Sequence, residues 1–152
     1  MTLASRRIDP AVYIPAPSAQ DADPDRSVAS RSRPVILVVE DDTLLRMHAA
    51  EMIDEAGFDV VEAQNADIAM VVLESRPDIA ILFTDIDMPG SMNGLKLAQA
   101  VASRWPLIHI VATSGHFQMR DGDLPAGGQF LPKPYRSNQI LGMLHELVDA
   151  GS

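Results

Sequence analysis

The chain has 152 residues, with 12 lysines and arginines against 21 aspartates and glutamates, so its formal net charge is −9. An acidic excess of this size argues against nucleic-acid and anionic-membrane partners, because both kinds of binding depend on clustered basic side chains. The sequence has no cysteine, which excludes disulfides and cysteine nucleophiles, and no apolar run near the roughly 20 residues that a membrane helix needs.

Residues 1–33 differ in composition from the rest of the chain. They hold four of the eleven prolines and five arginines against four aspartates, without a periodic apolar pattern. Such a segment cannot bury enough apolar surface to offset its ordering entropy, so we predict a flexible N-terminal tail. A docking peptide around residues 12–14 is the alternative. Asp9 and Pro10 interrupt any apolar core of a secretory signal, and we expect a cytoplasmic protein.

Five strands are predicted after the tail. Residues 35–39, 79–83 and 107–111 form nearly continuous apolar runs, which are typical of strands covered on both faces in a parallel sheet. Charged residues interrupt residues 58–62, which favours a strand at the edge of the sheet. Residues 129–131 predict a short fifth strand.

Helices are predicted between the strands, because apolar residues recur there at helical spacing. The four stripes cover residues 45–56, 66–73, 95–102 and 140–148. Strands that alternate with helices predict a doubly wound α/β fold with a parallel sheet, and residues 34–150 suffice for one such domain. The connection at residues 112–129 carries four glycines and a proline, so a helix there is expected to be short or degenerate.

Polar side chains follow four of the predicted strands. They are Glu40, Asp41, Asp42, Asp85, Asp87, Thr113 and Lys133. Sites in open parallel sheets form beyond the carboxyl ends of the strands, so these groups should meet at one edge. Carboxylates of this kind suit Mg²⁺, and a carboxylate beside such a metal can accept a phosphoryl group. Taken singly, acids at these places are often only helix caps, as Asp42 could be.

Four motifs together resemble the receiver domain of response regulators in two-component signalling. The motifs are VILVVEDD at residues 35–42, LFTDIDMPG at 82–90, VATSG at 111–115 and FLPKPY at 130–135. They occur in the family's order at close to its spacing. The resemblance implies a flavodoxin-like five-stranded sheet with strand order 2-1-3-4-5.

The resemblance also implies a role for each residue of the motifs. Asp85 would accept the phosphoryl group, and Thr113 and Lys133 would bind it. Glu40, Asp41, Asp85 and the main-chain carbonyl of Asp87 would hold Mg²⁺. Phe130 would move with Thr113 as a switch, and the peptide bond between Lys133 and Pro134 would be cis. Ser114 departs from the family, where alanine or glycine is typical.

We expect a stand-alone receiver, because the tail and the residues after Val148 are too short for a DNA-binding module. The resemblance implies that it is not an enzyme, although slow self-dephosphorylation is compatible with it. It would take a phosphoryl group from a histidine kinase or a His-phosphotransfer protein. It would signal to an unidentified downstream protein, as a monomer or weak homodimer. Two alternatives stay open: a metal-dependent phosphatase that uses Asp85 and Asp87, and an interaction module that is never phosphorylated.

Overall fold

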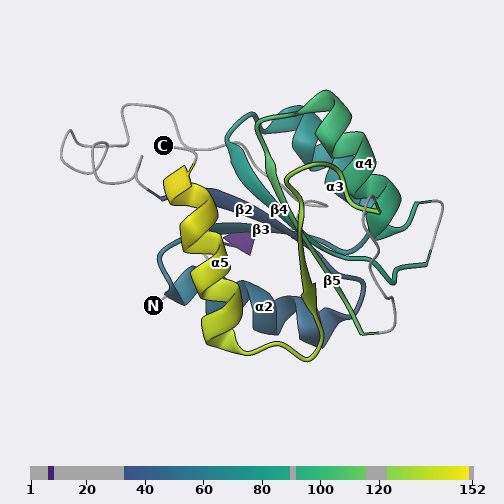
Figure 1. Ribbon diagram of the computed structural model, residues 1–152. Coiled ribbons are helices and arrows are strands. Elements are labelled where there is room, and N and C mark those ends of the chain that lie inside the picture. The colour runs from purple at the N-terminus through teal and green to yellow at the C-terminus, as the bar shows by residue number, and fades with distance from the viewer. Residues whose placement is uncertain (1–6, 9–32, 90–91, 116–122, 151–152) are drawn as a thin grey trace.

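The computed structural model describes residues 7–8, 33–89, 92–115 and 123–150 (Figure 1). The strands are β1 (Arg7–Ile8), β2 (Val35–Val39), β3 (Asp59–Ala63), β4 (Ile79–Asp85), β5 (His109–Ser114) and β6 (Gln129–Pro132). The helices are α2 (Thr43–Glu55), α3 (Ala66–Ser75), α4 (Gly94–Arg104) and α5 (Ser137–Ala150). All five predicted strands and all four predicted helices are present, with ends that shift by a few residues.

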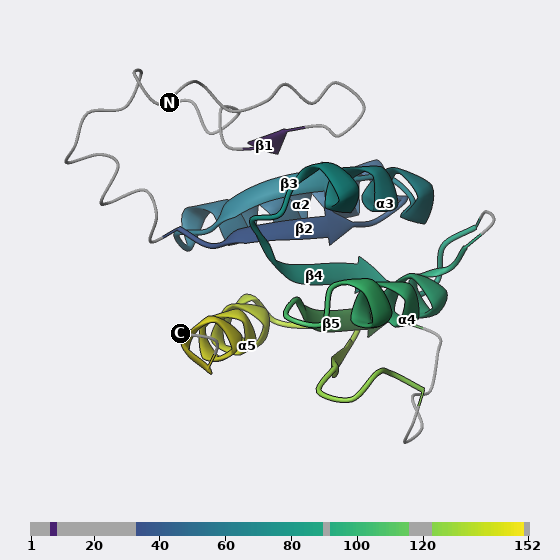
Figure 2. The ribbon, with the colours of Figure 1, turned by 90° about the horizontal axis from the view of Figure 1, so that it is seen from above.

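The strands form one parallel sheet with the order β1-β3-β2-β4-β5-β6. Counted along the chain, the five strands from β2 to β6 have the order 2-1-3-4-5, which confirms the predicted fold. The two-residue β1 lies outside β3, where Arg7 pairs with Val60 and Ile8 with Val61 (Figure 2). Parallel pairing at every step brings the carboxyl ends of all the strands to the same edge of the sheet.

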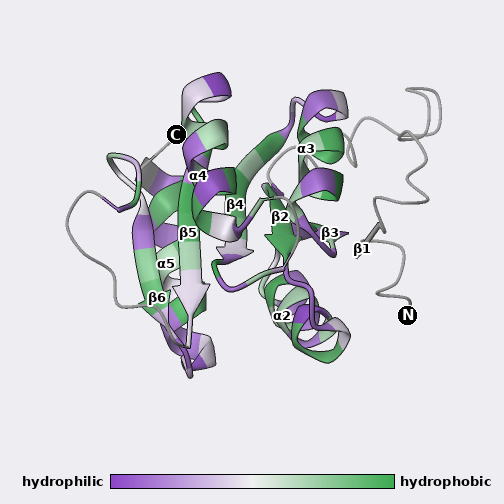
Figure 3. Cartoon of the chain, turned by 90° about the vertical axis from the view of Figure 1, so that its right-hand side faces the viewer, coloured by the Kyte–Doolittle hydropathy of each residue, from purple (hydrophilic) through white to green (hydrophobic). Residues whose placement is uncertain are grey.

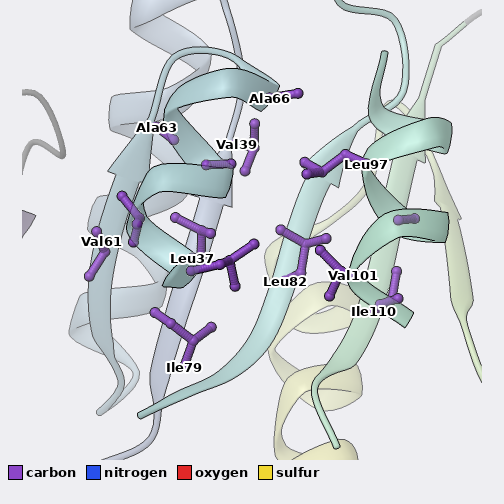
Figure 4. Packing of buried hydrophobic residues seen from close by; sticks show 14 of the residues in the cluster. Leu37, Val39, Val61, Ala63, Ala66, Ile79, Leu82, Leu97, Val101 and Ile110 are labelled. Carbon is purple, nitrogen blue, oxygen red and sulfur yellow. The ribbon is translucent and has the colours of Figure 1, made fainter. Parts of the chain in front are cut away.

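Helices cover both faces of the sheet, α2 and α5 on one side and α3 and α4 on the other (Figures 1 and 2). Side chains of a strand alternate between the faces, so Leu37 and Val39 enter the core beneath α3 and α4, and Ile36 and Val38 enter the core beneath α2 and α5. The first core interlocks β2 and β4 with α4 through residues such as Leu82 (Figure 4). The strands are hydrophobic through the centre of the molecule because both their faces are buried (Figure 3).

Short polar side chains begin three of the helices. The side chains of Asp42, Asn65 and Asn93 each accept a hydrogen bond from the main-chain amide three residues later, at 2.8–3.0 Å. These bonds satisfy amides that have no partner inside the helix. Asp42 is therefore a helix cap, as its alternative interpretation predicts. No helix in the described ranges is both long and apolar enough to cross a bilayer.

Two predictions about strands need correction. Leu107 was expected at the start of a strand, but β5 begins at His109 and Leu107 is 91% exposed. The amide of Ile108 instead donates to the carbonyl of Trp105 at 3.0 Å, in a turn with Pro106 at its second position, where proline is favoured. In addition, β1 lies in the predicted tail and places β3 inside the sheet rather than at its edge. A two-residue strand has too little sequence to show a periodic pattern.

Arg33, which the sequence analysis assigns to the tail, contacts the domain. Its guanidinium group donates to the Asp59 carboxylate and to the Phe58 carbonyl, both at 2.9 Å. It also lies 3.7 Å from the carboxylate of Asp54, a side chain of α2 that is fully buried. The other predictions for the tail concern residues 1–6 and 9–32, which lie outside the described residues.

The connection between β5 and β6 differs from the other crossovers. Residues 123–128 contain turns and no helix. The amide of Gly128 donates to the carbonyl of Pro125 at 2.9 Å, and Gly127 has a positive φ of 84°, a backbone conformation that favours glycine. The prediction of a short or degenerate helix also concerns residues 116–122, which lie outside the described residues.

Candidate functional site

The polar residues singled out in the sequence lie at the carboxyl edge of the sheet. Glu40 follows β2, Asp85 ends β4, Thr113 lies at the end of β5, and Lys133 follows β6. Thr113 is the register partner of Asp85 across the β4–β5 pair. The order of the strands therefore places β4, and with it Asp85, between the strands that supply the other groups.

Three carboxylates converge at this edge. Glu40, Asp41 and Asp85 each offer an oxygen, and these oxygens lie within 4.8 Å of one another. Glu40 and Asp85 are buried, whereas Asp41 is exposed. The amide of Asp42 donates to Glu40 at 3.1 Å, which fixes the direction of that side chain. Like charges held this close repel one another, so the cluster needs cations to balance it.

Lys133 supplies one of these cations. Its Nζ atom lies 3.1 Å from Oε1 of Glu40 and 3.4 Å from Oδ1 of Asp85. Burial lowers the pKa of the Lys133 ammonium, but the attraction of Glu40 and Asp85 outweighs burial, so the pKa is raised overall. Lys133 is therefore charged at neutral pH. One ammonium against three carboxylates still leaves an excess of negative charge.

Burial raises the pKa of the two buried carboxylates, whereas it lowers the pKa of Lys133. Desolvation raises the pKa of Asp85, and Lys133 and the amide of Asp87 oppose this shift only in part. Desolvation likewise raises the pKa of Glu40, with a further increase from the nearby charge of Asp85. Both groups would be stabilised in their ionised form by an additional cation.

Asp87 and Ser114 link the loop after β4 to the end of β5. The amide of Asp87 donates to Oδ1 of Asp85 at 3.3 Å, and its carboxylate accepts a 2.5 Å hydrogen bond from the Ser114 hydroxyl. The carbonyl of Thr113 accepts from the amide of Ile86 at 2.8 Å. The Thr113 residue is itself almost fully buried, beside Asp85.

The remaining residues of the last motif lie at and beyond the end of β6. Phe130 is half-buried and pairs through its main chain with Ala112. The peptide bond between Lys133 and Pro134 is cis, the isomer that the resemblance implies. Tyr135, which the sequence analysis did not single out, packs its ring edge-on against Phe83, with ring centroids 6.1 Å apart.

Two further residues, Gly94 and Arg46, support the site, and neither the composition nor the motif spacing identifies them. A Cβ atom at Gly94 would lie 1.9 Å from the carbonyl oxygen of Asp85, so only glycine lets α4 begin against the main chain of that residue. Arg46 donates to the carbonyl of Glu40 at 2.9 Å and to the carboxylate of Glu62 at 3.3 Å. Arg46 thereby holds the loop that carries Glu40 and Asp41.

The donor set fits a hard divalent cation. Mg²⁺ prefers oxygen ligands and commonly takes one or two carboxylates together with water. The cluster supplies three carboxylates, with Asp41 open to solvent, and Lys133 neutralises only part of their charge. An acidic cluster of this composition is typical of the Mg²⁺ site of receiver domains.

Comparisons with known proteins agree with this geometry. Residues 36–145 match the sequence model of the response regulator receiver domain. The chain is 28% identical over 118 residues to the response regulator receiver protein CpdR of Brucella abortus, covering 76% of this chain and 97% of that protein. It is 30% identical over 107 residues to the transcriptional regulatory protein YrkP of Bacillus subtilis, covering 69% of this chain but only 45% of YrkP.

Solved structures of receiver proteins share this fold. The crystal structure of a response regulator receiver protein from Sinorhizobium medicae WSM419 superposes with a TM-score of 0.74 at 24% identity, and the match covers 80% of this chain and 99% of that one. The region that matches the family's sequence model, residues 36–145, contains the sheet from β2 to β6 except Val35, and the acidic cluster at its carboxyl edge. The chain belongs to the response regulator receiver domain family of two-component signal transduction.

Proposed function

We propose that this protein is a phosphoacceptor of a two-component phosphorelay and that Asp85 is its acceptor. The donor would be the phosphohistidine of a histidine kinase or of a His-phosphotransfer protein. A carboxylate oxygen of Asp85 would form a bond to phosphorus while the bond between phosphorus and the imidazole nitrogen breaks. The products are an acyl phosphate on Asp85 and a free histidine on the donor.

The observation that carries this proposal is the position of Lys133 between Asp85 and Glu40. The ammonium lies 3.4 Å from the Asp85 carboxylate, and the carboxylates of Glu40, Asp41 and Asp85 form one cluster. A structural ion pair needs one acid for one base, whereas here a single lysine contacts two acids and a third acid lies beside them. The excess of negative charge at a buried acceptor is what a divalent cation would balance.

Each neighbouring group has a proposed task. Glu40, Asp41, Asp85 and the main-chain carbonyl of Asp87 would hold Mg²⁺, which when bound would neutralise phosphoryl oxygens and lower the repulsion between donor and acceptor. Lys133 would pair with another phosphoryl oxygen, at a cost to its contacts with the carboxylates.

Thr113 would donate its hydroxyl to the phosphoryl group from the neighbouring strand. Phe130, on the next strand, would change its packing as Thr113 moves. Such a change shifts an equilibrium between two arrangements of the loops, and a downstream protein would bind one of them better. The proposed transfer requires donor and acceptor in one compartment, for which we propose the cytoplasm.

The surface beside the acceptor offers contacts for a protein donor. A pocket of about 500 Å³ opens next to Glu40 and Lys133 and is lined in part by Leu45 and Tyr135. Leu44 and Met47 are also exposed on the first turns of α2. Exposed apolar side chains beside a charged site provide contact area for a partner that brings its own histidine.

Incubation with Mg²⁺ and a small phosphodonor tests the proposal. Intact-mass spectrometry should show one added phosphoryl group on the wild-type chain and none on Asp85→Asn. Asp78→Asn, which removes an exposed carboxylate just before the amino end of β4, serves as the matched control and should still gain the group. Absence of the group from the wild type would favour an interaction module that is never phosphorylated.

A further inference from the structure

Ser114 ends β5, and its side chain lies almost fully buried beside the proposed acceptor. Its hydroxyl donates a hydrogen bond of 2.5 Å to the carboxylate of Asp87, a residue 27 positions away in the chain. Hydroxyl-to-carboxylate bonds of this length belong to the strong, charge-assisted class. The function proposed above gives no task to this hydroxyl.

The bond closes a ring of contacts around Asp85. The Asp85 carboxylate accepts from the amide of Asp87 at 3.3 Å, and the Asp87 carboxylate accepts from Ser114. The carbonyl of Ser114 accepts from the amide of Lys133 at 2.9 Å. The Lys133 ammonium completes the ring at 3.4 Å from Asp85. Within this ring, Ser114 joins the loop after β4 to the ends of β5 and β6.

Asp87 is held at two points in this ring, by its amide against Asp85 and by its carboxylate against Ser114. These two contacts limit rotation of the Asp87 main chain at its amide and of its side chain. The amide of Met88, which shares a peptide plane with the Asp87 carbonyl, donates to the carbonyl of Ile86 at 3.0 Å, so the direction of the Asp87 carbonyl depends on how the whole residue is held. The residue is otherwise exposed. Without the hydroxyl of Ser114, water would compete for the carboxylate, and only the long 3.3 Å amide bond of this pair of contacts would remain.

We propose that Ser114 is a positioning residue that acts through Asp87 and sets the affinity of the site for divalent cations. It orders the Asp87 carbonyl before a cation arrives, so less conformational freedom is lost on binding. The inference rests on the proposed function because it takes that carbonyl as a metal ligand. It goes further in assigning a role to the one residue of the VATSG motif that departs from the family.

Titration of the unphosphorylated chain with Mg²⁺ measures the effect directly, with amide shifts in NMR spectra as the readout. Ser114→Ala should raise the Kd for Mg²⁺ by about tenfold, the scale on which residues that orient metal ligands usually act. Ser114→Thr keeps a hydroxyl and should recover most of the affinity. A Kd for Ser114→Ala within about twofold of the wild type would overturn the inference, since it is below that scale.

A double-mutant cycle separates positioning from a general loss of packing. If Ser114 acts through Asp87, Asp87→Ala should weaken Mg²⁺ binding as Ser114→Ala does, and the double variant should be no weaker than Asp87→Ala alone. Independent, additive losses from the two substitutions would contradict the proposed route. Because Asp87 is exposed, Asp87→Ala also carries the test if Ser114→Ala fails to fold.

Hydrogen exchange without metal distinguishes this inference from the proposed function. The Asp87 amide should exchange faster in metal-free Ser114→Ala than in the metal-free wild type, because its residue is held at one point instead of two. Unchanged exchange would overturn the positioning role even if Asp85 is phosphorylated. Failure of phosphoryl transfer, with Mg²⁺ binding and exchange as expected, would overturn the proposed function and leave the role of Ser114 standing.

Discussion

The two ends of the sheet each bury a carboxylate beside a cation, but they do so in different ways. At the amino end of β2, the Arg33 guanidinium group contacts Asp54, Asp59 and a main-chain carbonyl. At the carboxyl end, the Lys133 ammonium contacts two members of a cluster of three carboxylates. The flat, multidonor guanidinium suits a fixed structural contact, whereas the compact ammonium can exchange one oxygen partner for another.

The two ends differ in how far the charge of their acids is already balanced by a cation. Arg33 faces two acids, one of which is 39% exposed and therefore largely screened by water. The acids at the carboxyl end are more numerous, and two of the three are buried, so a further cation can stabilise them. We therefore interpret the contacts of Arg33 at the amino end as structural, because they stabilise the fold, and the carboxyl end as the part that changes state. The following substitutions break or sharpen this comparison.

The largest effect is expected at Gly94. Gly94→Ala places a Cβ atom 1.9 Å from the carbonyl oxygen of Asp85, and the main chain there cannot yield as a flexible side chain would. We expect the free energy of unfolding to fall by about 3 kcal/mol, near the upper end for overpacking, with weaker Mg²⁺ binding as α4 and Asp85 separate. Chemical denaturation measures the first effect and metal titration the second.

Gly142 provides the control for this substitution. It lies in α5 with nothing within 4 Å of the position of a Cβ atom. Gly142→Ala should raise stability by about 0.5–1 kcal/mol, because alanine favours a helix interior over glycine. Equal losses for both substitutions would show that close approach at Asp85 is not what requires glycine.

An intermediate effect is expected at the amino end. A chain that starts at Arg33 and one that starts at Pro34 differ by a single residue, yet only the first retains the contact between Arg33 and the buried carboxylate of Asp54. We expect the shorter chain to be less stable by about 1–3 kcal/mol, the cost of weakening the contacts of a buried charged group. Thermal unfolding of the two chains measures the difference, and Mg²⁺ affinity should be the same in both.

Arg104→Met is the matched control for the arginine. Its ion pair with Glu74 leaves both side chains about half exposed, and its guanidinium group lies 4.4 Å from the centre of the Trp105 ring, so Arg104→Met should lower stability by no more than about 1 kcal/mol. A loss as large as that from removing Arg33 would mean that burial of Asp54 is not the cause.

The smallest effect is a pH dependence at the carboxyl end. The pKa of Asp85 is raised in the folded protein, mainly by burial, so ionisation of this group lowers stability as pH rises through the folded pKa. Without Mg²⁺, Asp85→Asn should therefore be more stable than the wild type at pH 7. This difference in the free energy of unfolding should shrink as pH falls and disappear below the ordinary pKa range of aspartate.

Denaturation curves at several pH values, with and without Mg²⁺, measure this prediction. Mg²⁺ should stabilise the wild type increasingly as its concentration rises above the Kd, with the logarithm of that concentration, and stabilise Asp85→Asn far less. A wild type that is more stable than Asp85→Asn at pH 7 without metal would contradict the account, since ionised Asp85 would then be favourably paired.

Much of the fold was predictable because burial on both faces makes β2 apolar throughout and gives β4 and β5 long apolar runs. The candidate site was predictable because parallel strands bring their ends together, so acids far apart in sequence meet. Neither rule predicts the need for glycine at Gly94, which arises because that residue lies too close to the main chain of Asp85 for a Cβ atom. The contact between Arg33 and Asp54 was missed for the same reason, because it depends on the geometry of two side chains that are 21 residues apart in the sequence.

Other misses follow from local chemistry. Leu107 fits an apolar run, but the turn at Pro106 removes it from the strand. The hydrogen bond from Ser114 to Asp87 left no signal, because a serine after a strand has many ordinary uses. The motif residues themselves were found through family resemblance as much as through physical pattern.

Localisation of the phosphoryl group tests the central claim most directly. After reaction with a small phosphodonor and Mg²⁺, tandem mass spectrometry of the proteolysed chain should place the added group on Asp85. Hydroxylamine should remove it, because hydroxylamine cleaves acyl phosphates and leaves phosphoesters intact. A group found on a serine or threonine, or one that survives hydroxylamine, would contradict the assignment of Asp85 as the acceptor.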